Sequence, residues 1–391
     1  MRRPLFTVYR KELRDALRDR RTVLMIFIAS VLTGPLMLVL MAQFIASQQE
    51  KAANPKVLIA GQERAPELVN FLQRHDVEIE AAPKDYESRI RQGLTEAVIV
   101  VPMDFGEKLA AGEAARVDLV FDDSRTEAGP AINQAERLLR AFNQEAGTLR
   151  LIARGVSPDL MTPVRVERMN TATPRQRGAL ILFIFPVFAI LAPMLGGMTI
   201  AIDSTAGERE RGSLEPLLAN PVPAPEFAVG KWLAAWSTAC AVAILTLTGF
   251  AAATLLYAQK KIPALQAIGA PELLQFVAVL VPFAALTSAL TLLICTFGRS
   301  YREAQTYMSY LVSAISFMPV VVLLSGMKDA AWQLAVPMLA QQTVLGRVMR
   351  GDALGAVDFL VPAAVCFAVA AACVAGVARQ LSDERIVFGR A

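Results

Sequence analysis

Long apolar runs alternate with polar stretches along the chain, and six of the runs are long enough to cross a membrane as helices. A bilayer core of about 30 Å requires about 20 apolar residues in a helix. Pro186 and Pro193 lie inside the second run and predict kinks there. The predicted spans are residues 22–46, 179–201, 227–257, 272–297, 306–326 and 357–378.

A weaker amphipathic stretch, residues 328–352, separates the last two runs. Pro337, Arg347 and Arg350 interrupt its apolar positions. It therefore predicts short outer interfacial helices rather than a seventh span.

Composition and charge distribution predict how the chain sits in the membrane. The chain is 54% hydrophobic and 19% charged, below the roughly 25% charged content of soluble domains. Eight Lys and Arg residues within the first 21 positions predict a cytoplasmic N-terminus. Six crossings then place the 203–222 loop and the 379–391 tail in the cytoplasm, and residues 47–177 outside a bacterial-type inner membrane.

The polar segment 47–177 has the pattern of a folded domain. Short β-branched runs predict strands, and they alternate with helical patterns at 64–75 and 128–154. The order predicts a small α/β sheet. The fold class is thus an α-helical polytopic membrane protein with an inserted extracytoplasmic α/β domain. The expected strands are 56–60, 77–80, 96–101, 116–121 and, on the return path, 164–170.

Motifs for catalysis and nucleotide binding are missing from the sequence. It holds no GxxxxGK[ST] phosphate loop, G-x-S-x-G elbow, H-E-x-x-H or C-x-x-C motif, and its net charge of +4 gives no reason to expect a nucleic-acid partner. His75 is the only histidine and the four cysteines lie in apolar runs, so no metal cluster is expected. We predict a non-enzymatic protein without a catalytic residue.

Charged residues are nearly absent from the interiors of the predicted spans. Lys231, Glu272, Glu303 and Asp358 lie near span ends. A secondary transporter that moves protons through a buried carboxylate is therefore disfavoured.

The polar loop after the second predicted span contains a short amphipathic helix. Ser213 is the expected N-cap, and the leucines that follow share one helix face. Such a face suits insertion into a groove of another protein, with the preceding charges giving orientation. An amphipathic loop on lipid headgroups is the open alternative. The candidate residues are Glu208, Arg209, Glu210, Arg211, Gly212, Ser213, Leu214, Glu215, Leu217 and Leu218.

The first 21 residues predict a second amphipathic helix. Apolar side chains recur at helical spacing and basic ones occupy the other face, a pattern typical of a helix lying in the membrane interface. A simple topology anchor and a partner contact both fit this pattern. The candidate residues are Phe6, Tyr9, Arg10, Lys11, Leu13, Arg14 and Leu17.

Three stretches together resemble the type-two ABC exporter permeases, and within them the NatB-like sodium-efflux permease subunits. They are YRKELRDALRDRRTVLM before the first span, GERERGSLEPLLANPV after the second and SDERIVFGR near the end. The pattern E-x-x-x-G-[ST]-L-E-x-L-L-x-x-P is the specific part, whereas the basic start is weak alone. The resemblance covers the membrane portion and its ends.

The resemblance implies a mechanism and partners. Two permease subunits, identical or related, pair in the lipid bilayer, and each docks on a separate ABC ATPase subunit. ATP and Mg are then bound by that partner and no cofactor by this chain. Residues 208–218 would form part of the coupling surface, residues 5–19 the connecting helix, and residues 328–352 the outer re-entrant helices.

The substrate stays open at this point. The resemblance implies sodium, but the spans offer only scattered hydroxyls such as Thr287, Ser288 and Thr291 as oxygen ligands. An apolar cleft would equally suit drugs, lipids or peptides. Two further alternatives are an ATPase-coupled sensor or assembly protein without transport, and a self-sufficient secondary transporter.

Overall fold

The computed structural model describes residues 4–53, 56–125, 128–160, 184–255, 269–325 and 329–382, with residues 164, 167, 169, 171–173 and 176 between them. It divides into two compact units. One unit comprises Met1–Ala42 with Thr171–Ala391 and is helical, and the other is Gln43–Asn170. The predicted strand 164–170, the start of the second predicted span and residues 256–257 lie wholly or largely outside the described residues.

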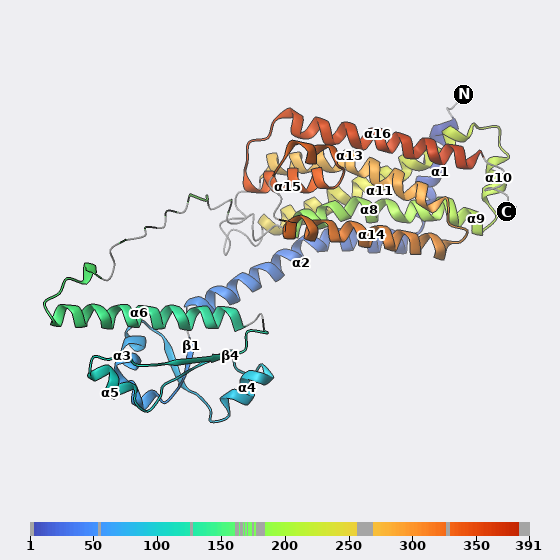
Figure 1. Ribbon diagram of the computed structural model, residues 1–391. Helices are drawn as coiled ribbons and strands as arrows, with labels where there is room; N and C mark the ends of the chain where they lie inside the picture. The colour runs from blue at the N-terminus through green and yellow to red at the C-terminus, as the bar shows by residue number, and fades with distance from the viewer. Residues whose placement is uncertain are drawn as a thin grey trace. The chain divides into compact units, whose positions relative to one another are not determined.

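The helical unit is a bundle of long apolar helices (Figure 1). Four described helices are long and apolar enough to cross a membrane: Phe185–Glu210, Ala224–Ala253, Ala270–Cys295 and Ala356–Leu381. The predicted spans 22–46 and 306–326 fall on helices of which the structure describes only part of the side chains, and they stay predictions. The helices are α1 (Pro4–Arg18), α2 (Arg20–Ala53), α8 (Ile184–Ile202), α11 (Ala224–Ala253), α13 (Ala270–Cys295), α14 (Tyr301–Ser325), α15 (Leu339–Arg350) and α16 (Ala356–Leu381).

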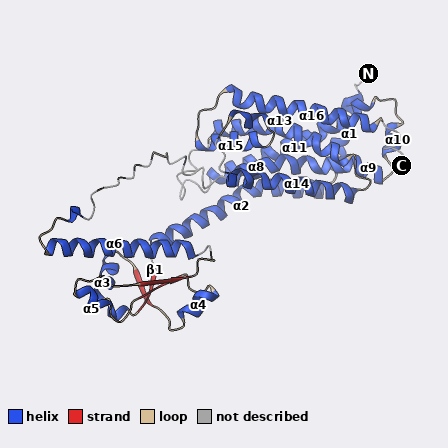
Figure 2. Ribbon diagram, viewed as in Figure 1, coloured by secondary structure: helices blue, strands red, loops and turns tan. Residues whose placement is uncertain are grey.

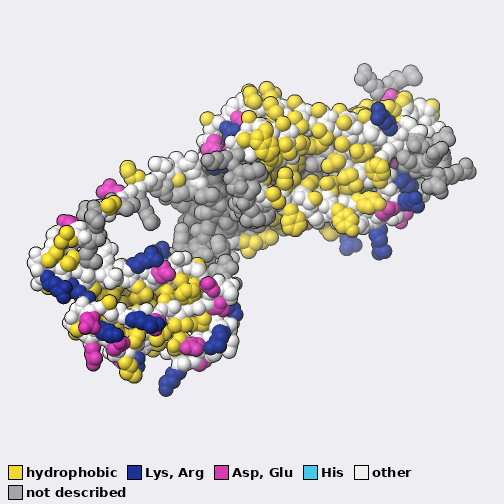
Figure 3. Space-filling view, viewed as in Figure 1, with side chains coloured by type: hydrophobic (Ala, Val, Ile, Leu, Met, Phe, Trp, Pro, Cys, Tyr) yellow, Lys and Arg dark blue, Asp and Glu magenta, His cyan; other side chains and the backbone are white. Residues whose placement is uncertain are grey.

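Helices α8, α11, α13 and α16 pack on one another, and α1 lies against α11. Trp232 and Trp236 of α11 donate their ring N–H groups to backbone carbonyls of α13, at 2.9 and 3.0 Å. Apolar side chains cover the visible face of the bundle, and Lys and Arg side chains gather at the end that holds α1 and α9 (Glu208–Glu210) (Figure 3). This distribution matches a bundle whose sides face lipid and whose ends face water.

The second unit contains a four-stranded sheet in the order β2-β1-β3-β4 (Figure 2). Strand β1 pairs in parallel with β2 and β3, and β4 pairs antiparallel with β3. Ile59, Phe71, Ile99, Phe105 and Ala135 belong to the core between strands and helices. The elements are β1 (Lys56–Ala60), α3 (Pro66–Arg74), β2 (Glu78–Ala81), α4 (Tyr86–Gln92), β3 (Ala97–Val100), α5 (Phe105–Ala110), β4 (Asp118–Phe121) and α6 (Gly129–Ala153).

Gly249 of α11 lies directly against the backbone of α2. A Cβ atom built there would lie 2.2 Å from the backbone carbonyl oxygen of Val31. Only glycine fits without a shift of one helix, because backbone atoms cannot rotate away. Gly346 of α15 has ordinary space, since its added Cβ would lie 3.7 Å from the Arg350 guanidinium.

We therefore expect Gly249→Ala to destabilise the helical unit by about 1–3 kcal/mol through overpacking. The matched change Gly346→Ala should be neutral or stabilising by up to about 1 kcal/mol, because alanine favours helix. Thermal unfolding of both variants in detergent measures the difference. Equal stability of the two variants would contradict the close approach of α2 and α11.

Candidate functional site

A lysine ammonium group is buried at the end of the bundle that holds α1 and α9. The Lys231 side chain of α11 is 1% exposed. Its Nζ lies 2.7 Å from Glu12 Oε1 of α1 and 2.7 Å from Glu208 Oε2 of α9. It also donates to the carbonyl oxygen of Ser204 at 2.8 Å. Two segments, α1 and the η4–α9 stretch, thus converge on a cation that α11 carries.

Lys11 of α1 completes this group of charges. Its Nζ pairs with Glu208 and lies 3.1 Å from Glu12 Oε1. Burial lowers the pKa of Lys11, but the Glu12 and Glu208 carboxylates outweigh that effect and raise the pKa above the ordinary lysine value. Two ammonium groups and two carboxylates balance each other, so burial of Glu12, Glu208 and Lys231 is tolerated. We call Lys11, Glu12, Glu208 and Lys231 the charged cluster.

A wide helical turn positions Glu208 for this contact. Residues Asp203–Gly207 form a π-helical turn, η4, between α8 and α9. Such turns insert one extra residue into a helix and are frequent at functional sites. Here the turn directs the Ser204 carbonyl and, four residues on, the Glu208 side chain to Lys231.

Close packing holds α1 against α11 beside the charged cluster. A Cβ built on Gly230 would lie 2.8 Å from Val8 Cγ1, so a larger residue there would displace α1. The Leu5 amide donates to Glu226 at 2.9 Å, and the Tyr9 hydroxyl lies 3.2 Å from Ser237 Oγ. The first helix is therefore fixed along the first half of α11, from Glu226 to Ser237.

The sequence prediction for the segment after α8 is partly wrong. Helix α10 (Leu214–Leu218) begins where expected, and Gly212 takes a left-handed φ of 64° at the turn before it. However, the Ser213 hydroxyl makes no cap hydrogen bond, and it donates to the carbonyl oxygen of Glu208 instead, at 3.2 Å.

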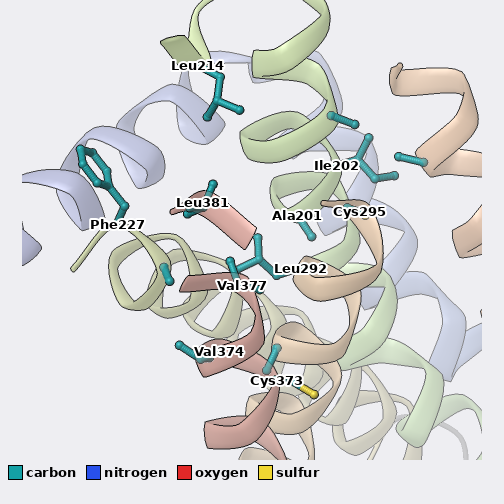
Figure 4. Packing of buried hydrophobic residues seen from close by; sticks show 14 of the residues in the cluster. Ala201, Ile202, Leu214, Phe227, Leu292, Cys295, Cys373, Val374, Val377 and Leu381 are labelled. Atoms are coloured by element: carbon teal, nitrogen blue, oxygen red, sulfur yellow. The ribbon is translucent and has the colours of Figure 1, made fainter. Parts of the chain in front are cut away.

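The leucine face of α10 packs against the chain's own helices. Leu214 is 3% exposed and lies in the same buried cluster as Phe227, Leu292 and Val377 (Figure 4). Leu217 and Leu218 pack against that cluster. The apolar face seen in the sequence is real, and the chain's own helices bury Leu214 fully and Leu217 and Leu218 in part.

The charges before α10 bind their own chain as well. Glu208, expected on the surface, is 4% exposed within the charged cluster. Arg209 donates to the Gly298 carbonyl at 2.9 Å, and Glu210 accepts the Tyr301 amide at 2.6 Å. Asp203 raises the pKa of Arg211 through a 2.9 Å ion pair. Of the candidate coupling residues, Glu210, Arg211, Gly212, Ser213 and Glu215 are exposed.

Residues of α1 divide between two surfaces. Val8 and Glu12 are its buried side chains, and Tyr9 packs beside Ile200, Ala234 and Ala235. The remaining candidates point elsewhere: Phe6, Arg10 and Arg14 are exposed, and Leu13 and Leu17 line a cavity between α1, α2, α8 and α11. The amphipathic pattern found the helix but did not identify Glu12.

Sequence reasoning missed Lys231 and Glu12 as members of one site. The sequence places Lys231 near the end of a span, whereas the structure buries its side chain almost fully. One signal was present, because a single Lys in the apolar run 227–257 requires a buried partner. The identity of that partner depends on tertiary packing, since Glu12 is 219 residues away.

A sequence profile of the ABC-2 family transporter proteins matches residues 6–375 of the chain. The match spans both units and includes the charged cluster. No solved structure matches the chain.

Two relatives are named as ABC transporter permeases. The chain is 28% identical to the ABC transporter permease protein NatB of Bacillus subtilis (strain 168) over 322 residues, which are 80% of each chain. It is 23% identical to the probable multidrug ABC transporter permease YbhR of Escherichia coli (strain K12) over 236 residues, 58% of this chain and 59% of the relative.

Removal of the Lys231 ammonium group should lower the stability of the helical unit. In Lys231→Met, Glu12 and Glu208 lose a buried partner, and we expect a loss of about 3–5 kcal/mol of stability. Fluorescence-detected thermal unfolding in detergent suits the test, because Trp232, Trp236 and Trp332 all belong to the helical unit.

A control and a rescue make this test specific. Arg350→Met removes partly exposed ion pairs to Asp329 and Asp352 and should cost about 0–1 kcal/mol. Glu12→Gln with Glu208→Gln should restore part of the stability of Lys231→Met. An unchanged unfolding temperature in Lys231→Met would refute the buried cluster.

Proposed function

This chain belongs to the ABC-2 family of transporter proteins and is the permease component of an ABC transporter, and we propose that this transporter is an ATP-driven exporter. The family works with an ATPase subunit, so the nucleotide site is proposed to lie on that partner. The observation that carries the proposal is the charged cluster, because it joins α1, the α9–α10 segment and α11. A partner that moves one of these segments would move all three.

We propose that the ATPase docks on the polar surface of α10 rather than on its leucines. Glu215 is exposed on that helix, while Leu214 inserts into the bundle core. ATP binding and closure of two ATPase subunits would press on α10 and, through Leu214 and Glu208, displace α8 and α11. Two permease copies, or this chain and a related permease, would then alternate between inward and outward states.

The proposed orientation follows from this mechanism. Helix α1, the α9–α10 segment and the chain's two ends would lie in the cytoplasm of a bacterial-type cell, with the α/β unit outside and α15 among the outer interfacial helices. In the described residues, Lys and Arg near α1 and α9 support a cytoplasmic position by the positive-inside rule.

Two substrate classes are proposed for the exporter. The resemblance to sodium-efflux permeases favours sodium ions. An organic amphiphile is the second candidate, and the observation that favours it is the cavity between α1, α2, α8 and α11, which has largely apolar walls. A sensor that binds an ATPase without transport is the remaining alternative.

Charge reversal on α10 tests the docking surface. Glu215→Lys should weaken co-purification with the ATPase by about tenfold or more, because one repulsive charge replaces an exposed attractive one. The matched change Glu87→Lys on exposed α4 should leave the complex intact. Full ATPase binding by Glu215→Lys, with correct membrane insertion, would reject α10 as the docking surface.

Proteoliposomes that contain the chain and its ATPase test transport and substrate together. We expect ATP hydrolysis that the transported substrate stimulates, accompanied by ATP-dependent flux. ATP-dependent sodium-22 flux would identify sodium ions as the substrate. ATP-dependent flux of an organic amphiphile, without sodium-22 flux, would identify the organic class instead. Hydrolysis with neither flux would favour the sensor.

A further inference from the structure

A cavity of about 590 Å³ lies beside the charged cluster in the helical unit. Its walls come from four parts of the chain that are far apart in the sequence: α1 with the start of α2, the end of α8 with η4 and α9, the middle of α11, and Tyr301 at the start of α14. The volume falls within the range of about 300–1,000 Å³ that holds drug-sized ligands. Apolar side chains form about half of the wall, among them Leu13, Leu17, Phe27, Ile200, Ala241 and Val242.

One buried hydroxyl group in the wall has an unmet hydrogen-bonding capacity. Ser204 is 3% exposed, and its Oγ has no hydrogen-bond partner among the described residues. A buried hydroxyl that lacks a partner costs free energy, and in native proteins it calls for an explanation. Its neighbour Thr205 meets the same need by donating to the Ala201 carbonyl at 2.6 Å. Ser204 is thus available to a polar group that enters the cavity.

The electrostatic character of the cavity is negative. Five carboxylates and two basic side chains line it, and with Lys231 directly behind the wall the local charge is still −2. Low-dielectric walls focus such a field into the space between them. Asp15 is half-exposed, so part of this charge is also in contact with solvent. The acids are Glu12, Asp15, Asp19, Asp203 and Glu208, and the bases are Lys11 and Arg211.

We infer that this cavity binds a monovalent organic cation with an apolar body. The apolar wall would accept the body, the acidic side would attract the charge, and Ser204 would be satisfied by a polar atom of the ligand. A bare metal cation is disfavoured here because, among the described residues, no three acidic, histidine or cysteine side chains lie close enough together to hold a metal ion. The inference deepens the proposed exporter function by giving its substrate a chemical class and a first binding site.

Binding to the full chain in nanodiscs tests the inference without the ATPase. Tetraphenylphosphonium and tetraphenylborate have nearly the same shape and opposite charge, so they separate charge recognition from apolar partition. After subtraction of empty nanodiscs, we expect saturable binding of the phosphonium only. Rising salt should weaken it, because exposed charges are screened.

Two kinds of variant locate the site. Ala241→Phe fills the cavity and should weaken phosphonium binding by about tenfold or more, equivalent to about 1.4 kcal/mol. The same change at exposed Ala252 of α11 should leave binding unchanged. Asp15→Asn with Asp19→Asn removes charge near the opening without adding bulk, and it should weaken phosphonium binding by about three- to tenfold.

The outcomes separate this inference from the proposed function. Equal binding of both probes, or wild-type phosphonium binding by folded Ala241→Phe and by the double Asp variant, would overturn the inference. A change of oligomeric mass in Ala241→Phe with unchanged phosphonium binding would identify the cavity as a subunit contact and overturn it too. If phosphonium binds in the cavity but does not stimulate ATP hydrolysis, the binding site would be supported and only its role in export would be rejected.

Discussion

Burial of the Lys231 ammonium is the constraint on which the arrangement of the helical unit depends. An unpaired charge in a dry interior costs several kcal/mol, so the lysine can be buried only with matching carboxylates. The chain supplies them from Glu12 and Glu208, which are 219 and 23 residues away. The first helix and the segment after α8 must therefore dock on α11 together. If either one detached, the buried Lys231 ammonium would lose one of its two carboxylate partners.

This constraint also explains how α10 can act on the bundle. Its apolar side lies in the same buried cluster as residues of α11, α13 and α16, while its polar side stays at the surface. Packed interiors transmit displacement because they contain little free volume. A force on the polar side of α10, as the proposed docking requires, would thus be delivered to three long helices by Leu214 and to α1 by Glu208.

Local sequence patterns predicted much of the fold and little of the site. Apolar runs located the long helices because their length is set by the bilayer, and β-branched runs located strands such as Lys56–Ala60. The leucine spacing in α10 correctly indicated a buried face but could not say which surface covers it. The Glu12–Lys231 pair was invisible for a related reason, since a pairing across 219 residues is decided by tertiary packing.

The position of the cavity links ligand and partner through shared residues. Glu12 and Glu208 line it and at the same time neutralise Lys231, so a cation in the cavity would compete with the ammonium for the same carboxylates. Any resulting shift of Glu208 reaches α10, because the Ser213 hydroxyl binds the Glu208 carbonyl. Linkage makes such coupling reciprocal: if the cation alters the affinity for a docked partner, the partner alters the affinity for the cation by the same factor. The charged cluster can therefore hold α1, α9 and α11 together and, at the same time, transmit to α10 whether a cation is bound in the neighbouring cavity.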